Sequence, residues 1–378
     1  MELAILIPAA CCGVLSLIHF VTIGVVALHR KAAHAGSPNG TRPEGIVTII
    51  RPVCGLENYL DETLASTFAL DWDDYEILFS VAGANDPAVP LIEELIAGHP
   101  QVPARLIVGG EPFSGNPKLN NLGEAWRAAR GAWIIIADSN VLMPPDCLDR
   151  LFSAWDTKSG LVCSPPIGAR PQGFWAEVEC GFLNTYQARW QRFASLAGFG
   201  FAHGKAMAWR RETLNAAGGL RALAAEPAED AAATKLVRRM GLHVRLIDRP
   251  FLQPLGQRRA GQVWQRQARW ARLRRATFPS LFALEFLNGS LPALAAAGLA
   301  AHAAGLPAGQ AVVALAALWY GAEAWLALAA GWHLSRWSPL AWCLRDLLLP
   351  ALWVAAWSGN RCVWRGNAVS LATGARTG

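Results

Sequence analysis

Residues 132–140 read Ala-Trp-Ile-Ile-Ile-Ala-Asp-Ser-Asn, a run of apolar strand-forming residues that ends abruptly in polar side chains. Comparable apolar runs occur earlier in the chain, at 46–53, 75–81 and 105–108. Stretches with helical periodicity separate these runs and lie at about 57–69, 88–98 and 117–130. Short apolar strands that alternate with helices predict an α/β domain with a Rossmann-like, mostly parallel sheet.

Polar side chains follow two of the predicted strands. Asp86 comes shortly after the second strand, and Asp138 and Asn140 follow the fourth. Ligands bind at the carboxyl ends of parallel strands, so Asp86 is a candidate contact to a uracil or ribose. The oxygens at Asp138 suit a divalent cation that accompanies a diphosphate leaving group. Taken singly, an ordinary turn at Asp86 or an ordinary cap at Asp138 would explain either residue equally well.

Two nucleotide-binding signatures are absent from the strand ends. Neither GxGxxG nor GxxxxGK[ST] follows any of the predicted strands. This argues against a dinucleotide-dependent dehydrogenase and against a P-loop NTPase. The eight cysteines form no CxxC pair, so we expect them to be reduced, and a zinc site is not indicated.

Two later segments carry further candidate chemistry. Glu229 and Asp230 precede an amphipathic helix predicted at 231–241. Acids are favoured at helix amino termini, but Asp230 could also deprotonate an acceptor hydroxyl as a general base. Farther on, seven arginines between residues 258 and 275 occur without an intervening acid, which suits a helix at an anionic lipid surface. Within it, Arg266-Gln-Ala-Arg269-Trp270 offers guanidinium groups for a diphosphate and an indole for stacking.

The composition indicates a membrane protein. Hydrophobic residues make up 53% of the 378 residues and charged residues only 16%, and the mean hydropathy is +0.24. Leu3 to Leu28 contains no Asp, Glu, Lys or Arg, and at about 1.5 Å per residue this helix would exceed the roughly 30 Å hydrocarbon core. A cleaved signal peptide would need basic residues before a shorter core. Here the basic residues, at 29–31, follow the run, so we expect an anchor with its amino terminus outside.

A second apolar region follows the basic segment. Residues 286–322 contain no Asp, Glu, Lys or Arg and are interrupted by a turn at 305–309. We therefore expect two further membrane spans, at about 283–304 and 310–331.

A third carboxy-terminal candidate span, 338–357, has Arg345 and Asp346 in its middle. It would be a re-entrant or interfacial helix, or a span in which the two charges pair. Arg361 and Arg365 are expected in the cytoplasm. This expectation favours two carboxy-terminal spans over three.

Eight short elements, in this order along the chain, resemble those of the ceramide glucosyltransferase family, which comprises membrane-bound inverting enzymes with a GT-A fold. They are Arg51-Pro52…Gly55-Leu56-Glu57, Asn85-Asp86-Pro87-Ala88, Asn116-Pro117-Lys118-Leu119-Asn120-Asn121, Asp138-Ser139-Asn140, Arg170-Pro-Gln172-Gly173-Phe174, Gly218-Gly219-Leu220, Ala228-Glu229-Asp230 and Arg266-x-x-Arg269-Trp270. With the apolar segments, this resemblance implies a GT-A catalytic domain between membrane helices. The expected parts are an anchor at 1–30, the catalytic domain at 45–255, basic interface helices at 256–282, membrane helices at 283–358 and a tail at 359–378.

The resemblance implies roles for individual residues. Pro52, Glu57, Asp86, Lys118, Asn121 and Asp138 would bind the nucleotide sugar. Asp138 and Asn140 would hold Mg²⁺ or Mn²⁺, Asp230 would be the general base, and Arg266, Arg269 and Trp270 would close over the leaving group and acceptor. Gln172, Phe174, Tyr186, His203 and Glu229 would line the acceptor. A histidine that animal members carry after the Gln-Gly-Phe element has no counterpart in 184–190, which leaves the acceptor side less defined.

The function that these expectations favour is transfer of glucose from UDP-glucose to the primary hydroxyl of ceramide at the cytoplasmic face of the inner membrane. An alternative keeps the chemistry but adds N-acetylglucosamine to a hopanoid polyol. A polysaccharide synthase would normally have more membrane spans, and a non-enzymatic membrane protein would not need acids at several strand and loop ends. Neither a nucleic acid nor an obligatory protein partner is expected.

Overall fold

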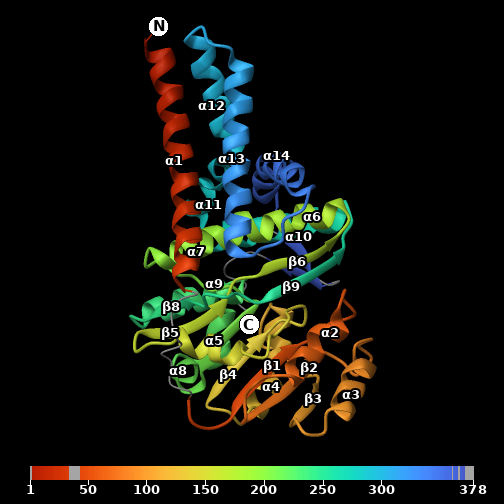
Figure 1. The fold of residues 1–378 in the computed structure, drawn as a ribbon. Coiled ribbons are helices and arrows are strands. Elements are labelled where there is room, and N and C mark those ends of the chain that lie inside the picture. The colour runs from red at the N-terminus through yellow and green to blue at the C-terminus, as the bar shows by residue number, and fades with distance from the viewer. Residues whose placement is uncertain (1, 34–42, 360, 365–366, 371–378) are drawn as a thin grey trace. The chain divides into compact units, whose positions relative to one another are not determined.

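The computed structural model describes residues 2–33, 43–359, 361–364 and 367–370. The chain divides into two compact units, whose elements are labelled in Figure 1. The sheet unit comprises Ser37–Arg170, Ala194–Gly256 and Asn360–Gly378, and the helical unit comprises Met1–Gly36, Pro171–Phe193 and Gln257–Gly359. The predicted catalytic segment, 45–255, is therefore divided, because its residues 171–193 belong to the helical unit. Arg365 and the end of the predicted tail, after residue 370, lie outside the described residues.

The sheet unit is built around a seven-stranded sheet with the order β3-β2-β1-β4-β7-β5-β8. Its strands are β1 Val47–Pro52, β2 Tyr75–Val81, β3 Ala104–Val108, β4 Trp133–Ala137, β5 Ser159–Ser164, β7 Ala206–Arg210 and β8 His243–Leu246. Strands β1 to β4 are parallel, β7 is antiparallel to β4 and β5, and β8 is parallel to β5. The four strands expected from the apolar runs are confirmed. So is the predicted fold class, a mostly parallel GT-A-like α/β domain with apolar helices at both ends of the chain.

Both faces of the central strands are buried, which explains why these strands are mostly apolar. Ile49 lies beside Ile77 and Ile135 in the register and packs into the core on one face. Its neighbour Ile50 lies beside Ile136 and packs into the core on the other face. All of these side chains are fully buried, and each contributes about 1.5–3 kcal/mol to folding.

Helices connect the strands of the sheet unit. They are α2 Leu60–Ala65, the 3₁₀ helix η1 Ser66–Phe68, α3 Val89–Gly98, α4 Pro117–Ala128, α5 Cys147–Ser153, α8 Arg211–Ala216, the 3₁₀ helix η3 Gly219–Ala225 and α9 Glu229–Arg239. Helix α4 begins where it does because the Asn116 side chain accepts a hydrogen bond of 2.9 Å from the backbone N–H of Lys118, and Pro117 suits the first helical position. Two short sheets complete the strands, one joining β6 Ile167–Gln172 to β9 Leu252–Gln257 and the other joining β10 Arg361–Trp364 to β11 Asn367–Ser370.

The helical unit consists of long apolar helices and shorter amphipathic ones. Its elements are α1 Glu2–Ala33, α6 Phe174–Gly181, the π-helical segment η2 Phe182–Ala188, α7 Arg189–Leu196 (whose last turn belongs to the sheet unit), α10 Ala260–Thr277, α11 Pro279–Ala283, the 3₁₀ helix η4 Glu285–Asn288, α12 Ser290–Ala303, α13 Ala308–Ala330 and α14 Ser338–Trp357. Helices α1, α12 and α13 run side by side (Figure 1). His19 of α1 stacks on Trp319 of α13 with ring centroids 3.6 Å apart. Helices α6, α10 and α14 contact one another.

Three helices of the described chain are long and apolar enough to cross a membrane, namely Glu2–His29 within α1, α13 and α14. The expected span at 283–304 is interrupted, because α12 begins only at Ser290 and has 14 residues. At about 1.5 Å per residue this helix is about 21 Å long, which is shorter than the hydrocarbon core. A contact with α14 accounts for the late start, since the backbone N–H of Ser290 donates to Asp346 at 3.0 Å.

The charges in the middle of α14 are paired. The guanidinium of Arg345, 1% exposed, binds both carboxylate oxygens of Glu323 on α13 at 2.8 Å. It also lies 2.7 Å from the carboxylate of Asp346. Because each buried charge has a partner, α14 remains compatible with a membrane interior. The prediction of two carboxy-terminal spans rather than three stays a prediction.

Candidate active site

The site is centred on Asp138, which directly follows β4. Two ammonium groups hold its carboxylate, with Lys118 Nζ 2.7 Å from Oδ1 and Lys205 Nζ 3.0 Å from Oδ2. Lys118 comes from the first turn of α4, and Lys205 directly precedes β7, which is the antiparallel neighbour of β4. Burial alone would raise the pKa of Asp138, but the two lysines outweigh it and hold that pKa well below its usual range. Asp138 is therefore a permanent anion at this edge of the sheet.

Lys118 connects Asp138 to the amino terminus of α9. Its ammonium lies 2.8 Å from Glu229 Oε1 and donates to the carbonyl of Gly204 at 2.7 Å. The side chain is only 8% exposed, and burial would lower its pKa. The carboxylates of Asp138 and Glu229 outweigh burial and raise it, so Lys118 keeps its charge.

Asp230 lies in the first turn of α9, beside Glu229. Its Oδ2 accepts a hydrogen bond of 3.2 Å from the backbone N–H of Gly204, and its Oδ1 accepts one of 2.8 Å from Ala231 N–H. Burial, together with the neighbouring Glu229 carboxylate, raises the pKa of Asp230 to about 6, although Lys118 and the two N–H groups oppose the shift. A carboxylate with this pKa is suited to accept a proton near neutral pH.

Gly204 lies between Lys118 and Asp230 and contacts both through its backbone. A Cβ atom at this position would lie 2.8 Å from Glu229 Oε1 and 3.3 Å from Lys118 Nζ. A larger residue here would push the Glu229 carboxylate and the Lys118 ammonium away from these positions. The structure thus brings together five of the residues singled out from the sequence, namely Lys118, Asp138, Asn140, Glu229 and Asp230.

Asp86 follows β2 at the same edge of the sheet and organises a loop there. Its carboxylate accepts hydrogen bonds from the backbone N–H of Gly55 at 3.0 Å and of Ala88 at 2.9 Å. Gly55 adopts a φ of +68°, which favours glycine. Pro52 ends β1, and Glu57 lies half-buried in the loop that follows it. The nucleotide contacts expected of Pro52, Glu57 and Asp86 stay predictions.

Asn121 holds the ends of β1 and β2 together. Its amide donates to the carbonyls of Val53 at 3.1 Å and Ser80 at 2.9 Å. Asn121 therefore positions the ends of these two strands. A nucleotide contact for Asn121 stays a prediction.

Arg51, in β1, positions the loop that carries Asp138. Its buried guanidinium donates to the carbonyls of Ser139 at 3.3 Å and Val141 at 2.9 Å. Burial lowers the pKa of Arg51 to about 10, so it remains charged at neutral pH.

Asp138 and Asn140 offer oxygen ligands of the kind that Mg²⁺ and Mn²⁺ prefer. One observation shows that these oxygens converge: Lys205 Nζ lies 3.0 Å from Asp138 Oδ2 and 3.0 Å from Asn140 Oδ1. The ammonium of Lys205 thus lies where a metal cation would contact the same two oxygens. The oxygens of Asp138 and Asn140 therefore fit a metal ion. Within the described ranges, no three His, Cys, Asp or Glu side chains form a metal-binding group. The protein would therefore supply Asp138 and Asn140, and further ligands would have to come from the substrate or solvent.

The Arg266-x-x-Arg269-Trp270 element lies on α10, in the helical unit. Arg266 Nη1 is 2.6 Å from Oε1 of Glu179, whose other oxygen is 3.1 Å from Arg258 Nε. Glu179, on α6, is completely buried, so it fixes the side of α10 that carries Arg266. Arg269 and Trp270 are half-buried. The predicted catalytic roles of the three residues stay predictions.

The residues expected to line the acceptor are divided between the units. Gln172, Phe174 and Tyr186 lie in the helical unit, where Tyr186 is buried and donates to Glu285 at 3.3 Å. His203 and Glu229 lie in the sheet unit. Glu229 binds Lys118 and accepts a hydrogen bond of 2.9 Å from the Asn116 amide, so its contacts support Lys118. An acceptor-lining role for these five residues stays a prediction.

Sequence reasoning considered His203-Gly204-Lys205 only as an acceptor lining or a turn, and it missed Lys205 as the partner of Asp138. It also missed Arg51 as part of this site and Glu179 as the partner of Arg266. A signal for Lys205 existed, since His203-Gly204-Lys205 directly precedes a strand-like segment. The contact between Lys205 and Asp138 could not be predicted, because it depends on the pairing of β7 with β4. Arg51 carried a signal as well, because a charged residue inside an apolar strand needs buried partners.

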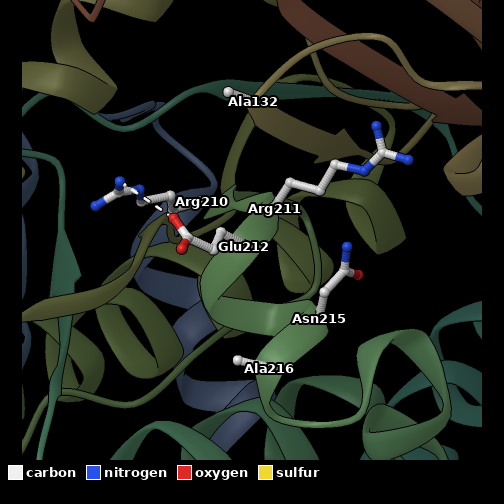
Figure 2. A pocket seen from close by; sticks show the side chains of 6 residues that line it. All are labelled: Ala132, Arg210, Arg211, Glu212, Asn215 and Ala216. Carbon is white, nitrogen blue, oxygen red and sulfur yellow. Dashed lines mark ion pairs between the residues drawn. The ribbon is translucent and has the colours of Figure 1, made fainter.

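A surface hollow of about 520 Å³ lies at the other end of β4. Figure 2 shows six of its lining residues, among them Arg210, which forms an ion pair with Glu212. Arg210 lies beside Trp133, the first residue of β4, whereas Asp138 follows the last. The hollow is therefore separate from the Asp138 site.

Comparison with known proteins gives matches along nearly the whole chain. The sequence model of the family described as "Glycosyl transferase family 21" matches residues 14–377. Ceramide glucosyltransferase 1 of Caenorhabditis elegans is 30% identical over 280 residues, which are 73% of this chain and 59% of that protein. Ceramide glucosyltransferase 3 of the same organism is 28% identical over 369 residues, which are 95% of this chain and 79% of that protein. The chain thus spans less than two thirds of the first of these relatives.

Among solved structures, the mannosyltransferase PcManGT from Pyrobaculum calidifontis in complex with GDP-Man and Mn²⁺ is similar, with a TM-score of 0.49 and 21% identity. The match covers 90% of this chain and 99% of that one.

Proposed function

The chain belongs to glycosyl transferase family 21, and we propose that it transfers glucose from UDP-glucose to the primary hydroxyl of ceramide, forming glucosylceramide. The observation that carries this proposal is the grouping of Asp230, with its pKa of about 6, beside the ion-paired Lys118 and Asp138. The two curated relatives described above are ceramide glucosyltransferases, which supports ceramide over a hopanoid polyol as the acceptor.

In the proposed step, the acceptor oxygen bonds to the anomeric carbon of glucose while the bond from that carbon to the UDP phosphate oxygen breaks. Asp230 takes the hydroxyl proton, and UDP leaves with the electron pair. A single displacement of this kind inverts the anomeric centre and needs one base and no protein nucleophile. The raised pKa of Asp230 makes it a stronger base than an ordinary aspartate while leaving most of it ionised at pH 7.

The cationic groups beside Asp138 are Lys118 and Lys205, and they are proposed to stabilise the departing diphosphate. Lys118 keeps its charge because Asp138 and Glu229 flank it. A divalent cation held by Asp138 and Asn140 would neutralise charge that develops on the departing diphosphate. Arg266, Arg269 and Trp270 are the proposed further contacts to the leaving group and acceptor, through guanidinium hydrogen bonds and indole stacking.

The membrane arrangement of the proposal follows from charge. The apolar run Leu3–Leu28 of α1 is followed by basic residues at 29–31, which favours a cytoplasmic location for the segment between α1 and the carboxy-terminal membrane helices. A catalytic unit on that side would meet a cytoplasmic UDP-sugar and a lipid alcohol at the same membrane face. The arginine-rich α10 would be attracted to anionic lipid headgroups there.

Product analysis tests the proposal. Purified full-length protein in lipid nanodiscs is given ceramide or bacteriohopanetetrol, each with UDP-glucose, UDP-galactose or UDP-N-acetylglucosamine, and the lipid products are identified by mass and anomeric NMR. We expect a β-linked hexose on ceramide with UDP-glucose as the best donor. A product from the hopanoid alone, or an α-linked product, would overturn the proposed acceptor or the proposed stereochemistry respectively.

A further inference from the structure

Lys205 occupies the place where a divalent cation would have to bind. Its ammonium is hydrogen-bonded to both proposed cation ligands, Asp138 and Asn140, at 3.0 Å each. The residue is buried, and its backbone carbonyl accepts a hydrogen bond of 2.9 Å from the N–H of Asp138. Lys205 is thus fixed at its backbone to the residue that its side chain neutralises.

We propose that Lys205 excludes free divalent cations from Asp138 and Asn140, so that the cation binds only together with the nucleotide diphosphate. This inference rests on the proposed function for the identity of that nucleotide. It makes Lys205 a positioning residue that sets the order in which the ligands of the reaction bind.

The balance of charges in the site carries the inference. Around Asp138 the charges in direct contact are the carboxylates of Asp138 and Glu229 and the ammonium groups of Lys118 and Lys205. The neighbouring Asp230, mostly ionised at neutral pH, adds a further negative charge beside Glu229. A divalent cation that binds alone would add two positive charges beside two ammonium groups in a largely buried site. Like charges at such distances repel strongly where water is scarce. The protein without nucleotide therefore has little affinity for the cation.

A nucleoside diphosphate reverses this balance. Its phosphates bring negative charge into the site. The two lysines do not fully compensate this charge, because they already pair with carboxylates of the protein. They also offer the ammonium of Lys205 a new partner within reach of its flexible side chain. When Lys205 turns to the phosphates, Asp138 and Asn140 are released as cation ligands. The cation and the diphosphate then each raise the affinity of the other, as linkage requires.

The experiment measures Mn²⁺ binding by the loss of the free-ion EPR signal, using full-length protein in nanodiscs after chelator treatment. Wild-type protein, Lys205→Met and the control Lys158→Met are titrated with and without UDP. Methionine is a flexible side chain only one atom shorter than lysine and carries no charge. Lys158 is exposed. We expect UDP to tighten Mn²⁺ binding by the wild type and the control on the order of a hundredfold. Lys205→Met should bind Mn²⁺ alone on the order of tenfold more tightly than wild type, with a correspondingly smaller effect of UDP.

Two results would overturn the inference. One is a wild-type protein that binds Mn²⁺ equally well with and without UDP, and the other is a Lys205→Met protein whose affinity for Mn²⁺ alone equals that of the wild type. If Lys205→Met fails to fold, Lys205→Gln tests the same expectation and keeps a polar end. Titration with Mn²⁺ alone needs neither donor nor acceptor. A failed product assay combined with intact coupling between Mn²⁺ and UDP would therefore reject the glucosyl-transfer proposal and leave this inference standing.

Discussion

Asp230 is the residue on which the proposed chemistry depends most directly. Its carboxylate is held by two backbone N–H groups, which orient it, while burial and Glu229 make it more basic. The two effects serve different needs of a general base, which must point in a defined direction and must be able to take a proton.

Replacing the base should therefore separate catalysis from binding. Asp230→Asn keeps the shape of the side chain and removes the basic oxygen, so turnover should fall by about 10²–10⁴-fold. The dissociation constant for UDP, measured by calorimetry, should change only a few-fold. The matched control is Asp73→Asn, at an exposed aspartate before β2, which should retain full activity. Turnover by Asp230→Asn close to the wild-type rate would show that another group takes the proton.

The raised pKa of Asp230 predicts a pH dependence with a definite sign. Only the ionised carboxylate can accept a proton, so activity is present above the pKa of about 6 and is lost as the pH falls below it. On the acid side, kcat/KM should decline about tenfold per pH unit. The profile is measured with saturating cation over about pH 5 to 8, where an ordinary aspartate, with a pKa of about 4, would stay ionised. A flat profile down to pH 5 would contradict the assignment.

At the scale of elements, a deeply buried ion pair between Arg345 and Glu323 joins α14 to α13 in the helical unit. Arg345 lies between Glu323 of α13 and Asp346 of its own helix, and it also donates to Thr185 at 2.8 Å. Such a pair adds little net stability over a well-packed apolar contact, but removing one partner leaves buried charges uncompensated.

Arg345→Met should thus destabilise the protein by about 3–5 kcal/mol, because two carboxylates lose their cation. Thermal unfolding in detergent measures the effect. Adding Glu323→Gln to Arg345→Met should restore part of the loss, since one of the two orphaned charges is then removed. The control Arg336→Met, at an exposed position, should change stability by less than about 0.5 kcal/mol. Equal destabilisation by both arginine variants would mean that the buried ion pairs contribute no more to stability than an exposed arginine does.

Helices α6 and α10 are connected by a different buried charge. Glu179 receives both Arg258 and Arg266, so the first arginine of the Arg266-x-x-Arg269-Trp270 element is oriented by a carboxylate from another helix. The sequence pattern of α10 predicts a lipid-facing basic helix with a diphosphate contact and a stacking indole, but not this buried carboxylate. Helix α10 therefore has a polar contact with Glu179 inside the protein, in addition to its proposed contact with lipid.

For the whole molecule, the positive-inside rule makes a prediction about sidedness. Residues between α1 and the carboxy-terminal membrane helices should lie in the cytoplasm, and the turn between α12 and α13 should lie on the other side of the membrane. Lys158→Cys, at an exposed position of the sheet unit, and Leu306→Cys, in the α12–α13 turn, test the two sides.

A membrane-impermeant maleimide should label Lys158→Cys only in inside-out vesicles and Leu306→Cys only in right-side-out vesicles. The parent protein supplies the background from its own cysteines. Labelling of both positions from the same side would contradict the expected arrangement, and labelling of Lys158→Cys from outside would remove the proposed access to cytoplasmic UDP-glucose.

Several features of the fold could be predicted from local pattern. The strands β1 to β4 follow from apolar runs such as Ile134-Ile-Ile136, because strands that are buried on both faces are mostly apolar along their length. The apolar helices follow from the absence of charge over stretches long enough to cross a membrane. The start of α12 at Ser290 did not follow, since it depends on a hydrogen bond to Asp346, which is 56 residues away.

The candidate site shows the same division between local and distant information. Asp138 and Asp230 could be singled out because strand ends and helix starts are recognisable in the sequence, and both positions depend on near neighbours. That Lys205 neutralises Asp138, 67 residues earlier, could not be recognised, because it requires β7 to pair antiparallel with β4. Hydrophobic periodicity is a property of adjacent residues and determines strands and helices, whereas the partner of a charge depends on which distant segments the folded sheet brings together.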